Sequence, residues 1–103
     1  MLPISWKFIG IYPPKAYWIK CNTDGATQGC PRLAACGGIF RDSSAATLGC
    51  FARNIGVTYA FHAEFIGVMI AIEIANMKGW PLLCVETDSF LVTLAFKNVT
   101  MVP

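Results

Sequence analysis

Hydrophobic and polar residues alternate along "YWIKCNTDG", residues 17–25. A period of two predicts a strand, with Cys21 on one face and Asp24 on the other, close to the strand's end. The glycines and the proline of "GATQGCPR" (25–32) predict a loop. Strand patterns follow in "LAACGGIF" (33–40) and "ATLGCFARNIG" (46–56), with the polar turn "RDSSA" between them. We therefore expect an antiparallel meander of three strands.

The period changes after the meander. Residues 63–78, "AEFIGVMIAIEIANMK", lack proline, repeat apolar residues at helical spacing and are followed by Gly79 as a stop. This predicts a helix that carries Glu64 in its first turn. Because the helix is apolar nearly all round, we expect it to be covered on more than one side. "PLLCVETDS" (81–89) predicts a fourth strand, parallel to the first, and Ser89 is placed to cap a last helix reaching about Lys97.

The length and composition of the chain predict a single domain. With 103 residues the chain has room for a single modest core; "YPPK" makes residues 1–16 an extension or linker, and residues 17–103 form the domain. The apolar fraction is 55%, above the usual value of about 45–50%. We therefore expect self-association through an uncovered face of the helix. No membrane span is expected, since the longest uncharged apolar stretch (65–72) is far shorter than the roughly 20 residues needed.

Other features of the composition narrow the function classes. Pro3, Lys7 and the Pro13-Pro14 pair interrupt any secretory signal, so we expect an intracellular protein of the nucleus or cytoplasm that is not secreted. The five cysteines contain no C-x-x-C pair, which supports neither a disulfide framework nor a zinc site, and we interpret them as small apolar residues. The net charge of +2 permits nucleic-acid binding without arguing for it.

Three of the six acidic residues fall at ends of predicted elements. Asp24 ends the first strand, Glu64 opens the helix and Asp88 ends the fourth strand. If the first and fourth strands are parallel neighbours, these carboxylates converge, and they resist ionising together unless a cation neutralises them. Oxygen ligands alone select a hard cation, Mg²⁺ or Mn²⁺. The pattern predicts a metal site suited to phosphoryl chemistry.

"WIKCNTDGA", "AACGGIFRD", "AEFIGVMIAIEIA" and "VETDS" together resemble the ribonuclease H family, most closely its members in plant retroelements (retrotransposons) and related plant reverse-transcriptase-like proteins. The resemblance covers residues 17–97 and implies a ribonuclease H-like mixed sheet of the α/β class. It implies that Asp24 bridges two metal ions, with Glu64 and Asp88 completing the shell of one. The implied activity is metal-dependent cleavage of the RNA strand of an RNA–DNA hybrid.

The same resemblance implies residues that contact nucleic acid. Backbone amides that meet 2′-hydroxyls distinguish RNA from DNA in this family. The matching positions are Gly25, Gly37, Gly38 and Ser89.

The chain departs from the family pattern after Asp88. Family members continue with a fifth strand, a final helix and a fourth acid that holds the water-activating metal, whereas no Asp or Glu follows Asp88 here. We therefore expect a C-terminally truncated domain, without that strand and helix, that is weak or inactive as a ribonuclease. The alternative is a non-catalytic nucleic-acid-binding remnant. A third hypothesis takes "DGATQG" (24–29) as the phosphate loop of an actin-like or sugar-kinase-like ATPase.

Several polar residues stay open between two interpretations. Glu86 shares a strand face with Asp88 and is either an outer-shell residue or a solvated or salt-bridged one. His62 either contacts phosphate or makes a local polar contact. Lys20, Arg41 and Arg53 either touch a phosphate backbone or lie on solvated faces.

Overall fold

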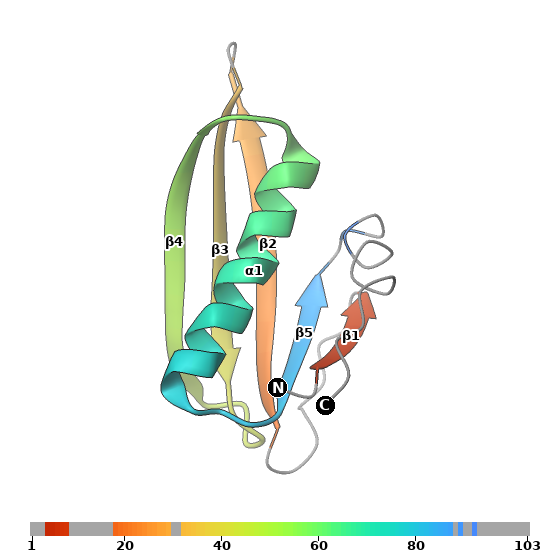
Figure 1. Cartoon of the computed structure of the whole chain (residues 1–103), viewed down its shortest axis with the longest axis vertical. Helices are drawn as coiled ribbons and strands as arrows, with labels where there is room; N and C mark the ends of the chain where they lie inside the picture. Colours follow the sequence, from red (N-terminus) through yellow and green to blue (C-terminus); the bar gives the residue numbers. More distant parts are fainter. Residues whose placement is uncertain (1–3, 9–17, 30–31, 88, 90–91, 93–103) are drawn as a thin grey trace.

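The computed structural model describes residues 4–8 (by their backbone), 18–29, 32–87, 89 and 92. Six elements make up the fold (Figure 1). They are β1 (Ile4–Phe8), β2 (Ile19–Gln28), β3 (Leu33–Arg41), β4 (Thr47–Val57), α1 (Ala60–Lys78) and β5 (Leu83–Thr87). The elements lie in two layers, a sheet and one helix.

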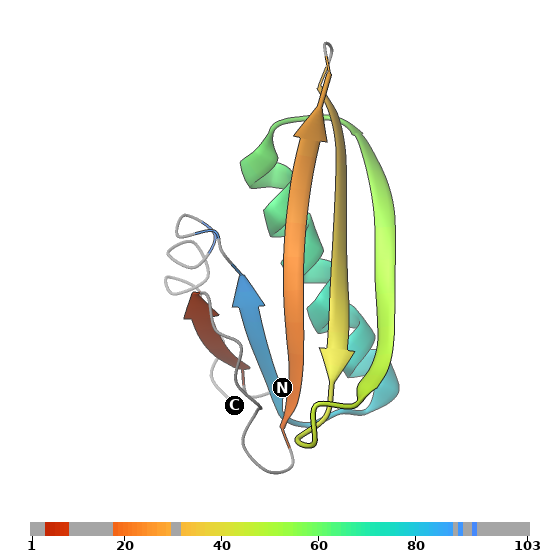
Figure 2. The ribbon, with the colours of Figure 1, turned by 180° about the vertical axis from the view of Figure 1, so that it is seen from behind.

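The sheet has the strand order β1-β5-β2-β3-β4. β2, β3 and β4 form an antiparallel meander, as predicted. β5 follows the helix and pairs in parallel with β2, which confirms the predicted crossover. The helix lies on one face of the sheet, and Figure 2 shows the strands from the opposite side. No described helix covers that opposite face.

β2 is longer than the sequence pattern predicts. Residues 25–28 were expected to form a loop, but they continue the strand and pair with β3 from Gly25↔Cys36 to Gln28↔Leu33. The backbone hydrogen bonds offered by β3 override the weak strand preference of glycine in this stretch. Asp24 consequently lies inside the strand rather than at its end.

α1 begins at Ala60, three residues earlier than predicted. Tyr59 is the N-cap residue, in an extended conformation without a side-chain cap, and its carbonyl accepts a bond from Ala63 N–H at 3.2 Å. No acid lies in the first turn, so the prediction that Glu64 opens the helix is wrong: Glu64 belongs to the second turn. Gly79 ends the helix in the left-handed conformation (φ 71°), as its position predicts.

The core lies between α1 and the sheet. Val68, Ala71 and Ala75 of the helix are buried against apolar side chains of three strands, Cys21, Phe40, Leu83 and Val85 among them. Trp80 packs on Phe40 with ring centroids 5.1 Å apart, at the edge of this core.

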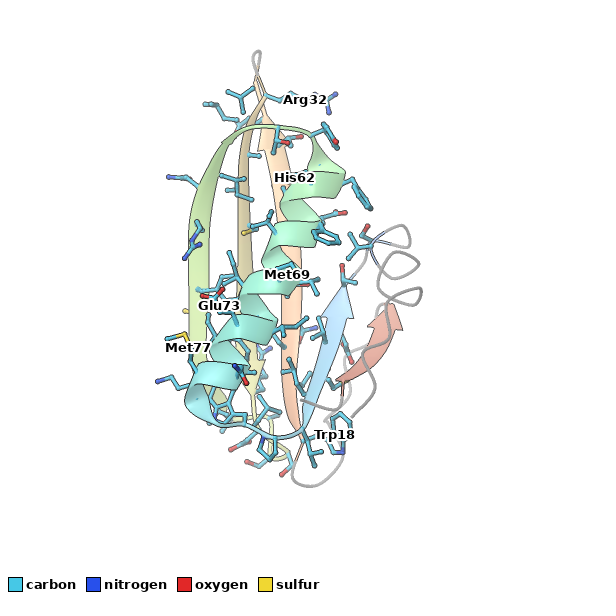
Figure 3. All side chains as sticks on the ribbon, viewed as in Figure 1. Trp18, Arg32, His62, Met69, Glu73 and Met77 are labelled. Atoms are coloured by element: carbon cyan, nitrogen blue, oxygen red, sulfur yellow. The ribbon has the colours of Figure 1, made fainter. Side chains whose placement is uncertain are left out.

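The outer side of α1 is open to solvent in the described structure. Met69, Glu73 and Met77 follow one another along it (Figure 3), and Met77 is 77% exposed. The expected cover on a second side is absent among the described residues, and self-association through this side stays a prediction. α1 has the length and apolar composition of a membrane span, as core helices of soluble proteins also do, and here it packs on the sheet.

A strand lies within the stretch that was expected to be an extension. β1 pairs in parallel with β5, from Ile4↔Leu83 to Phe8↔Thr87, and forms one edge of the sheet. The sheet therefore has five strands although the chain shows no strand after β5 in its described part. The domain boundary near residue 17 stays a prediction.

The end of the chain is described only at Ser89 and Val92 beyond β5. Val92 N–H donates to Ser89 Oγ at 3.2 Å, the bond that a helix-capping serine makes to the third residue of its helix. This agrees with the predicted cap. The rest of the predicted helix to Lys97, and Asp88 itself, lie outside the described residues.

Candidate active site

Asp24 lies in the middle of β2 with an exposed side chain. It pairs across the sheet with Gly37. One carboxylate oxygen, Oδ1, accepts a bond from the N–H of Gly25 at 2.9 Å, and this bond holds the carboxylate against its own strand. Because side chains alternate along a strand and position 25 faces α1, Asp24 projects from the opposite face.

Glu64 meets β2 at the residue directly after Asp24. A Cβ atom placed on Gly25 would lie 2.5 Å from the backbone nitrogen of Glu64 and 2.8 Å from its Cγ. The second turn of α1 therefore lies directly on the β2 backbone at this point, and the half-buried Glu64 side chain starts beside it. The structure thus places Glu64 beside the residue that follows Asp24, whereas convergence of the two carboxylates stays a prediction.

Asp88, the third predicted acid, lies outside the described residues. The described pairing of β2 with β5 ends at Thr23↔Thr87, the residues immediately before Asp24 and Asp88. Among described residues, no group of three His, Cys, Asp or Glu side chains is placed to hold a metal ion. The two described acids supply only carboxylate oxygens, a donor type that fits Mg²⁺ or Mn²⁺.

The glycines predicted to contact nucleic acid face different ways. Gly37 pairs with Asp24 and shares its face of the sheet. Gly38 faces α1, and a Cβ atom there would lie 2.4 Å from a ring carbon of Phe51 and 3.1 Å from Cys21 Sγ. Packing of the phenylalanine ring alone therefore accounts for glycine at position 38. A contact of Gly25, Gly37, Gly38 or Ser89 with nucleic acid stays a prediction.

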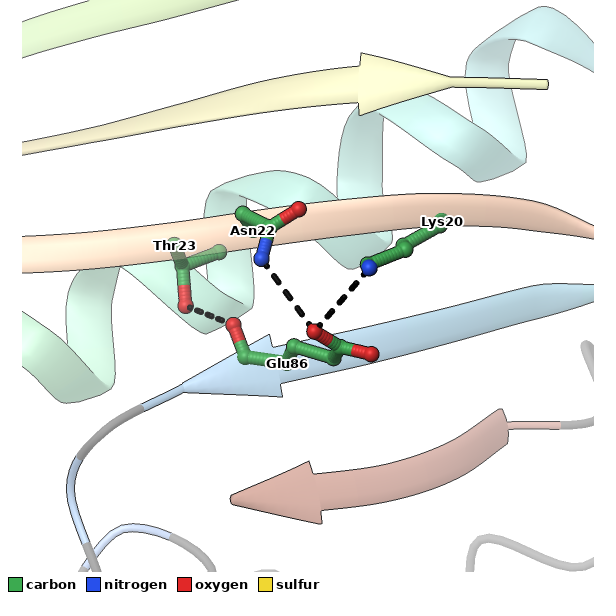
Figure 4. Close-up of polar contacts among 4 residues, drawn as sticks. All are labelled: Lys20, Asn22, Thr23 and Glu86. Atoms are coloured by element: carbon green, nitrogen blue, oxygen red, sulfur yellow. Dashed lines mark hydrogen bonds and ion pairs between the residues drawn. The ribbon is translucent and has the colours of Figure 1, made fainter. Parts of the chain in front are cut away.

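Glu86 takes part in a buried polar cluster between β2 and β5 (Figure 4). Its Oε2 atom lies 3.2 Å from Lys20 Nζ and accepts a bond from Asn22 Nδ2 at 3.3 Å. Thr23 Oγ1 donates to the Glu86 backbone oxygen at 3.4 Å. The Glu86 and Lys20 side chains are 2% and 6% exposed. Of the two interpretations of Glu86, the salt bridge is the one that the structure shows.

Burial also decides the role of Lys20. With its ammonium group paired to Glu86 inside the protein, Lys20 is neither on a solvated face nor available to a phosphate backbone. Sequence reasoning missed this pairing, although the alternation of β2 and β5 put both side chains on one sheet face. Their relative register, Lys20↔Cys84 and Asn22↔Glu86, was the missing information.

The remaining candidates are peripheral. His62 is exposed near the start of α1, and its ring lies edge-on to Tyr59 with centroids 6.3 Å apart; this is an aromatic contact, so both the polar contact and the phosphate contact stay predictions. The four described cysteines are free, and all but Cys50 are buried. Burial raises the pKa of Cys21 to about 12, which keeps this thiol protonated and unreactive near neutral pH.

Comparisons with known proteins agree with this fold. The family model described as reverse transcriptase-like matches residues 22–101. A putative ribonuclease H protein of Arabidopsis thaliana is 42% identical over 83 residues, which make up 81% of this chain and 13% of that protein. The structure of LC11 ribonuclease H1 in complex with an RNA/DNA hybrid is similar with a TM-score of 0.69 and 29% identity, over 82% of this chain and 64% of that one.

A second solved structure, ribonuclease H1 from the halophilic archaeon Halobacterium salinarum, has a TM-score of 0.70 and 26% identity, over 82% of this chain and 65% of that one. The mixed sheet with its single core helix is a ribonuclease H-like fold. The chain belongs to the reverse transcriptase-like family, which its matched residues 22–101 establish. It spans less than two thirds of the length of these relatives.

Proposed function

We propose that this domain binds RNA–DNA hybrids and hydrolyses phosphodiester bonds of their RNA strand at Asp24 and Glu64, together with Asp88. The observation that carries the proposal is the contact of Glu64 with the backbone directly after Asp24. The relative LC11 ribonuclease H1, which is 29% identical, binds an RNA/DNA hybrid in its crystal structure, and this supports the substrate class.

The residues proposed to hold Mg²⁺ or Mn²⁺ are these three carboxylates. When bound, such a cation supplies charge neutralisation at the transferring phosphoryl group and lowers the pKa of bound water. The chain's own contribution is to hold the acids. Asp24 is held by its bond to Gly25 N–H and by its position within a paired strand, while Glu64 is held by the helix that packs on that strand.

The exposed face of the sheet around Asp24 is the proposed binding surface for the RNA–DNA hybrid. Gly37 lies beside Asp24 without a side chain that would keep a nucleic-acid backbone away. Gly25 and Ser89 flank the acids in sequence and are retained as proposed contacts, as is Gly38. An origin in a plant retroelement and an intracellular location are also retained as proposals.

We expect slow cleavage by the 103-residue chain. No Asp or Glu follows Asp88 in it, so a second, water-activating cation would be held by Asp24 alone. Residues that act as one unit in catalysis are strongly non-additive, and the loss of one approaches the loss of all. The second candidate function is a non-catalytic nucleic-acid-binding domain, which the same assay tests.

The test is a cleavage and binding assay with an end-labelled RNA–DNA hybrid in the presence of Mg²⁺. The expected result is binding with slow cleavage that Asp24→Asn abolishes, while the matched exposed change Asp42→Asn has no effect. Binding without any cleavage that depends on Asp24 supports the non-catalytic function. Fast cleavage that Asp24→Asn abolishes contradicts the expected weakness, and no binding at all contradicts both functions.

The ATPase hypothesis loses its basis in the structure. Residues 24–28 of the supposed phosphate loop form part of β2 and are paired with β3. A phosphate loop needs backbone amides that are free to turn toward a ligand. We therefore do not retain this hypothesis.

A further inference from the structure

Two glycines lie where α1 crosses β2, one on each element. Gly25 belongs to the strand and follows Asp24 directly, and Gly67 belongs to the helix, three residues after Glu64. Residues three apart on a helix share a face, so Gly67 and Glu64 meet the strand together. The crossing therefore lies at the two acids of the candidate site.

The clearance at Gly25 is too small for any side chain. A Cβ atom there would lie 2.5 Å from Glu64 N and 2.8 Å from Ala63 C, and both of these are backbone atoms of the helix. Backbone atoms of a hydrogen-bonded helix cannot swing aside as a flexible side chain can. A methyl group at position 25 has to move the second turn of α1 away from the strand.

The clearance at Gly67 is less strict but lies at the same place. A Cβ atom there would lie 3.3 Å from Cys36 Cβ and 3.6 Å from the carbonyl oxygen of Asp24. The helix thus rests on the backbone of Asp24 itself. A methyl group at position 67 would make an ordinary contact with the Asp24 carbonyl oxygen, but it would crowd Cys36 of β3, so that the helix or Cys36 has to shift by a few tenths of an ångström.

Other glycines show that this closeness is local. A Cβ atom on Gly49 of β4 would meet no atom within 4 Å. A Cβ atom on Gly38, which pairs with Thr23, would meet the ring of Phe51 and not the helix backbone. Among the described glycines, Gly25 and Gly67 are the two that lie between the strand backbone at Asp24 and the helix backbone at Glu64.

We propose that Gly25 and Gly67 are positioning residues that set the separation of Glu64 from Asp24 and thereby the affinity of the site for a divalent cation. The inference rests on the proposed function. Asp24 is held in the sheet by pairing with β3, whereas Glu64 moves with the helix, so a change in their spacing displaces one ligand relative to the other. Sites of this kind tolerate displacements of only about half an ångström.

The experiment measures Mn²⁺ binding by calorimetry and electron paramagnetic resonance on the 103-residue chain. It compares Gly25→Ala, Gly67→Ala and the control Gly49→Ala, each checked for folding by amide spectra. We expect Gly25→Ala to weaken Mn²⁺ binding by about tenfold or more, the range seen when residues that orient metal ligands are changed. Gly67→Ala should weaken binding less, and Gly49→Ala should leave it unchanged.

Gly67→Ala separates positioning from a general loss of structure. Alanine favours a helix over glycine by about 1 kcal/mol, which offsets the crowding against Cys36, so this change is expected to leave the melting temperature nearly unchanged while it weakens Mn²⁺ binding. A merely structural glycine would move both quantities in the same direction. If Gly25→Ala does not fold, Gly67→Ala alone decides: binding as tight as that of Gly49→Ala overturns the proposal.

A double-variant cycle with Glu64→Gln gives a second readout. If Gly25 acts through Glu64, the loss of Mn²⁺ affinity caused by Glu64→Gln is smaller in the Gly25→Ala chain than in the original chain. Additive losses overturn the positioning role. An original chain that binds no Mn²⁺ overturns the proposed function itself, whereas tight Mn²⁺ binding by both the original chain and Gly25→Ala overturns only this inference.

Discussion

The two faces of β2 are stabilised in different ways. Cys21 faces α1 and belongs to a closely packed apolar core, whereas Lys20 and Asn22 face the other way and bind Glu86 of β5. Apolar packing acts over many weak contacts, while the described polar face contains a buried charge pair. The same strand therefore serves the core on one side and holds a set of charges on the other.

The carboxylates of Glu86 and Asp24 lie on the same face of the sheet but in different environments. Lys20 neutralises Glu86, so the negative charge of Glu86 is compensated locally. Asp24, two residues beyond Asn22 on the same face, is exposed. Glu86 Oε1 is buried and has no hydrogen-bond partner in the described structure, which marks the cluster as sensitive to change.

The largest expected effect comes from breaking the polar face. Among the described residues, Lys20→Met leaves the buried Glu86 carboxylate with the Asn22 amide as its side-chain partner, and we expect a loss of about 3–5 kcal/mol in the free energy of unfolding. The measurement is urea unfolding followed by circular dichroism. The double variant Lys20→Met/Glu86→Leu should recover most of the loss, because it removes both charges. The exposed Lys78→Met is the control, and an equally small loss for Lys20→Met would contradict the comparison.

The apolar face should respond to the loss of volume instead of charge. Leu83 is fully buried beneath α1, and we expect Leu83→Ala to lower the free energy of unfolding by about 2–5 kcal/mol through lost burial and the cavity left behind. Leu33, 62% exposed, provides the matched control, and Leu33→Ala should change little. Urea unfolding at two salt concentrations sharpens the test: the Leu83→Ala loss should not depend on salt. Similar losses for the two leucines would show that the face is not packed as described.

The smallest expected effect concerns a carboxylate outside both faces. Hydrogen bonds from Ser44 and the Ala46 N–H lower the pKa of Asp42 below 3.8 in the turn between β3 and β4. Because the folded pKa is lowered, the associated stability is present above the unfolded pKa and is lost as the pH falls through the folded pKa. Ser44→Ala should raise the Asp42 pKa toward 3.8 and reduce this acid dependence slightly. A carboxyl titration by NMR checks the shift, and an unchanged pKa would contradict the assigned cause.

Most of the architecture follows from periodicity in the sequence. The alternation in residues 17–25, 33–40 and 46–56 predicted the meander, and the helical spacing ending at Gly79 predicted α1 and the parallel strand after it. These features depend on the periodic spacing of apolar residues, which can be read from a short stretch of neighbouring residues. The acids Asp24 and Glu64 could be selected in the same way, because each falls near a boundary between patterns.

Other features arose only from contacts between distant residues. The sequence pattern ended the first strand at Gly25, but pairing with β3 extends it to Gln28 and puts Asp24 in mid-strand. The role of Lys20 required the β2–β5 register, which links residues more than 60 positions apart, as the Asn22 to Glu86 bond shows with a separation of 64.

Side-chain period and functional groups are local properties, so the order and type of the central elements and the oxygen donors of the acids could be predicted from the sequence. Only the tertiary structure placed β1 at the edge of β5, paired Lys20 with Glu86 and set Glu64 against Gly25. The physical reason is that strand register and helix–sheet distance depend on packing over the whole domain. At position 25 the close approach of the helix requires a residue without a side chain. This requirement can be seen only once the helix is placed against the strand.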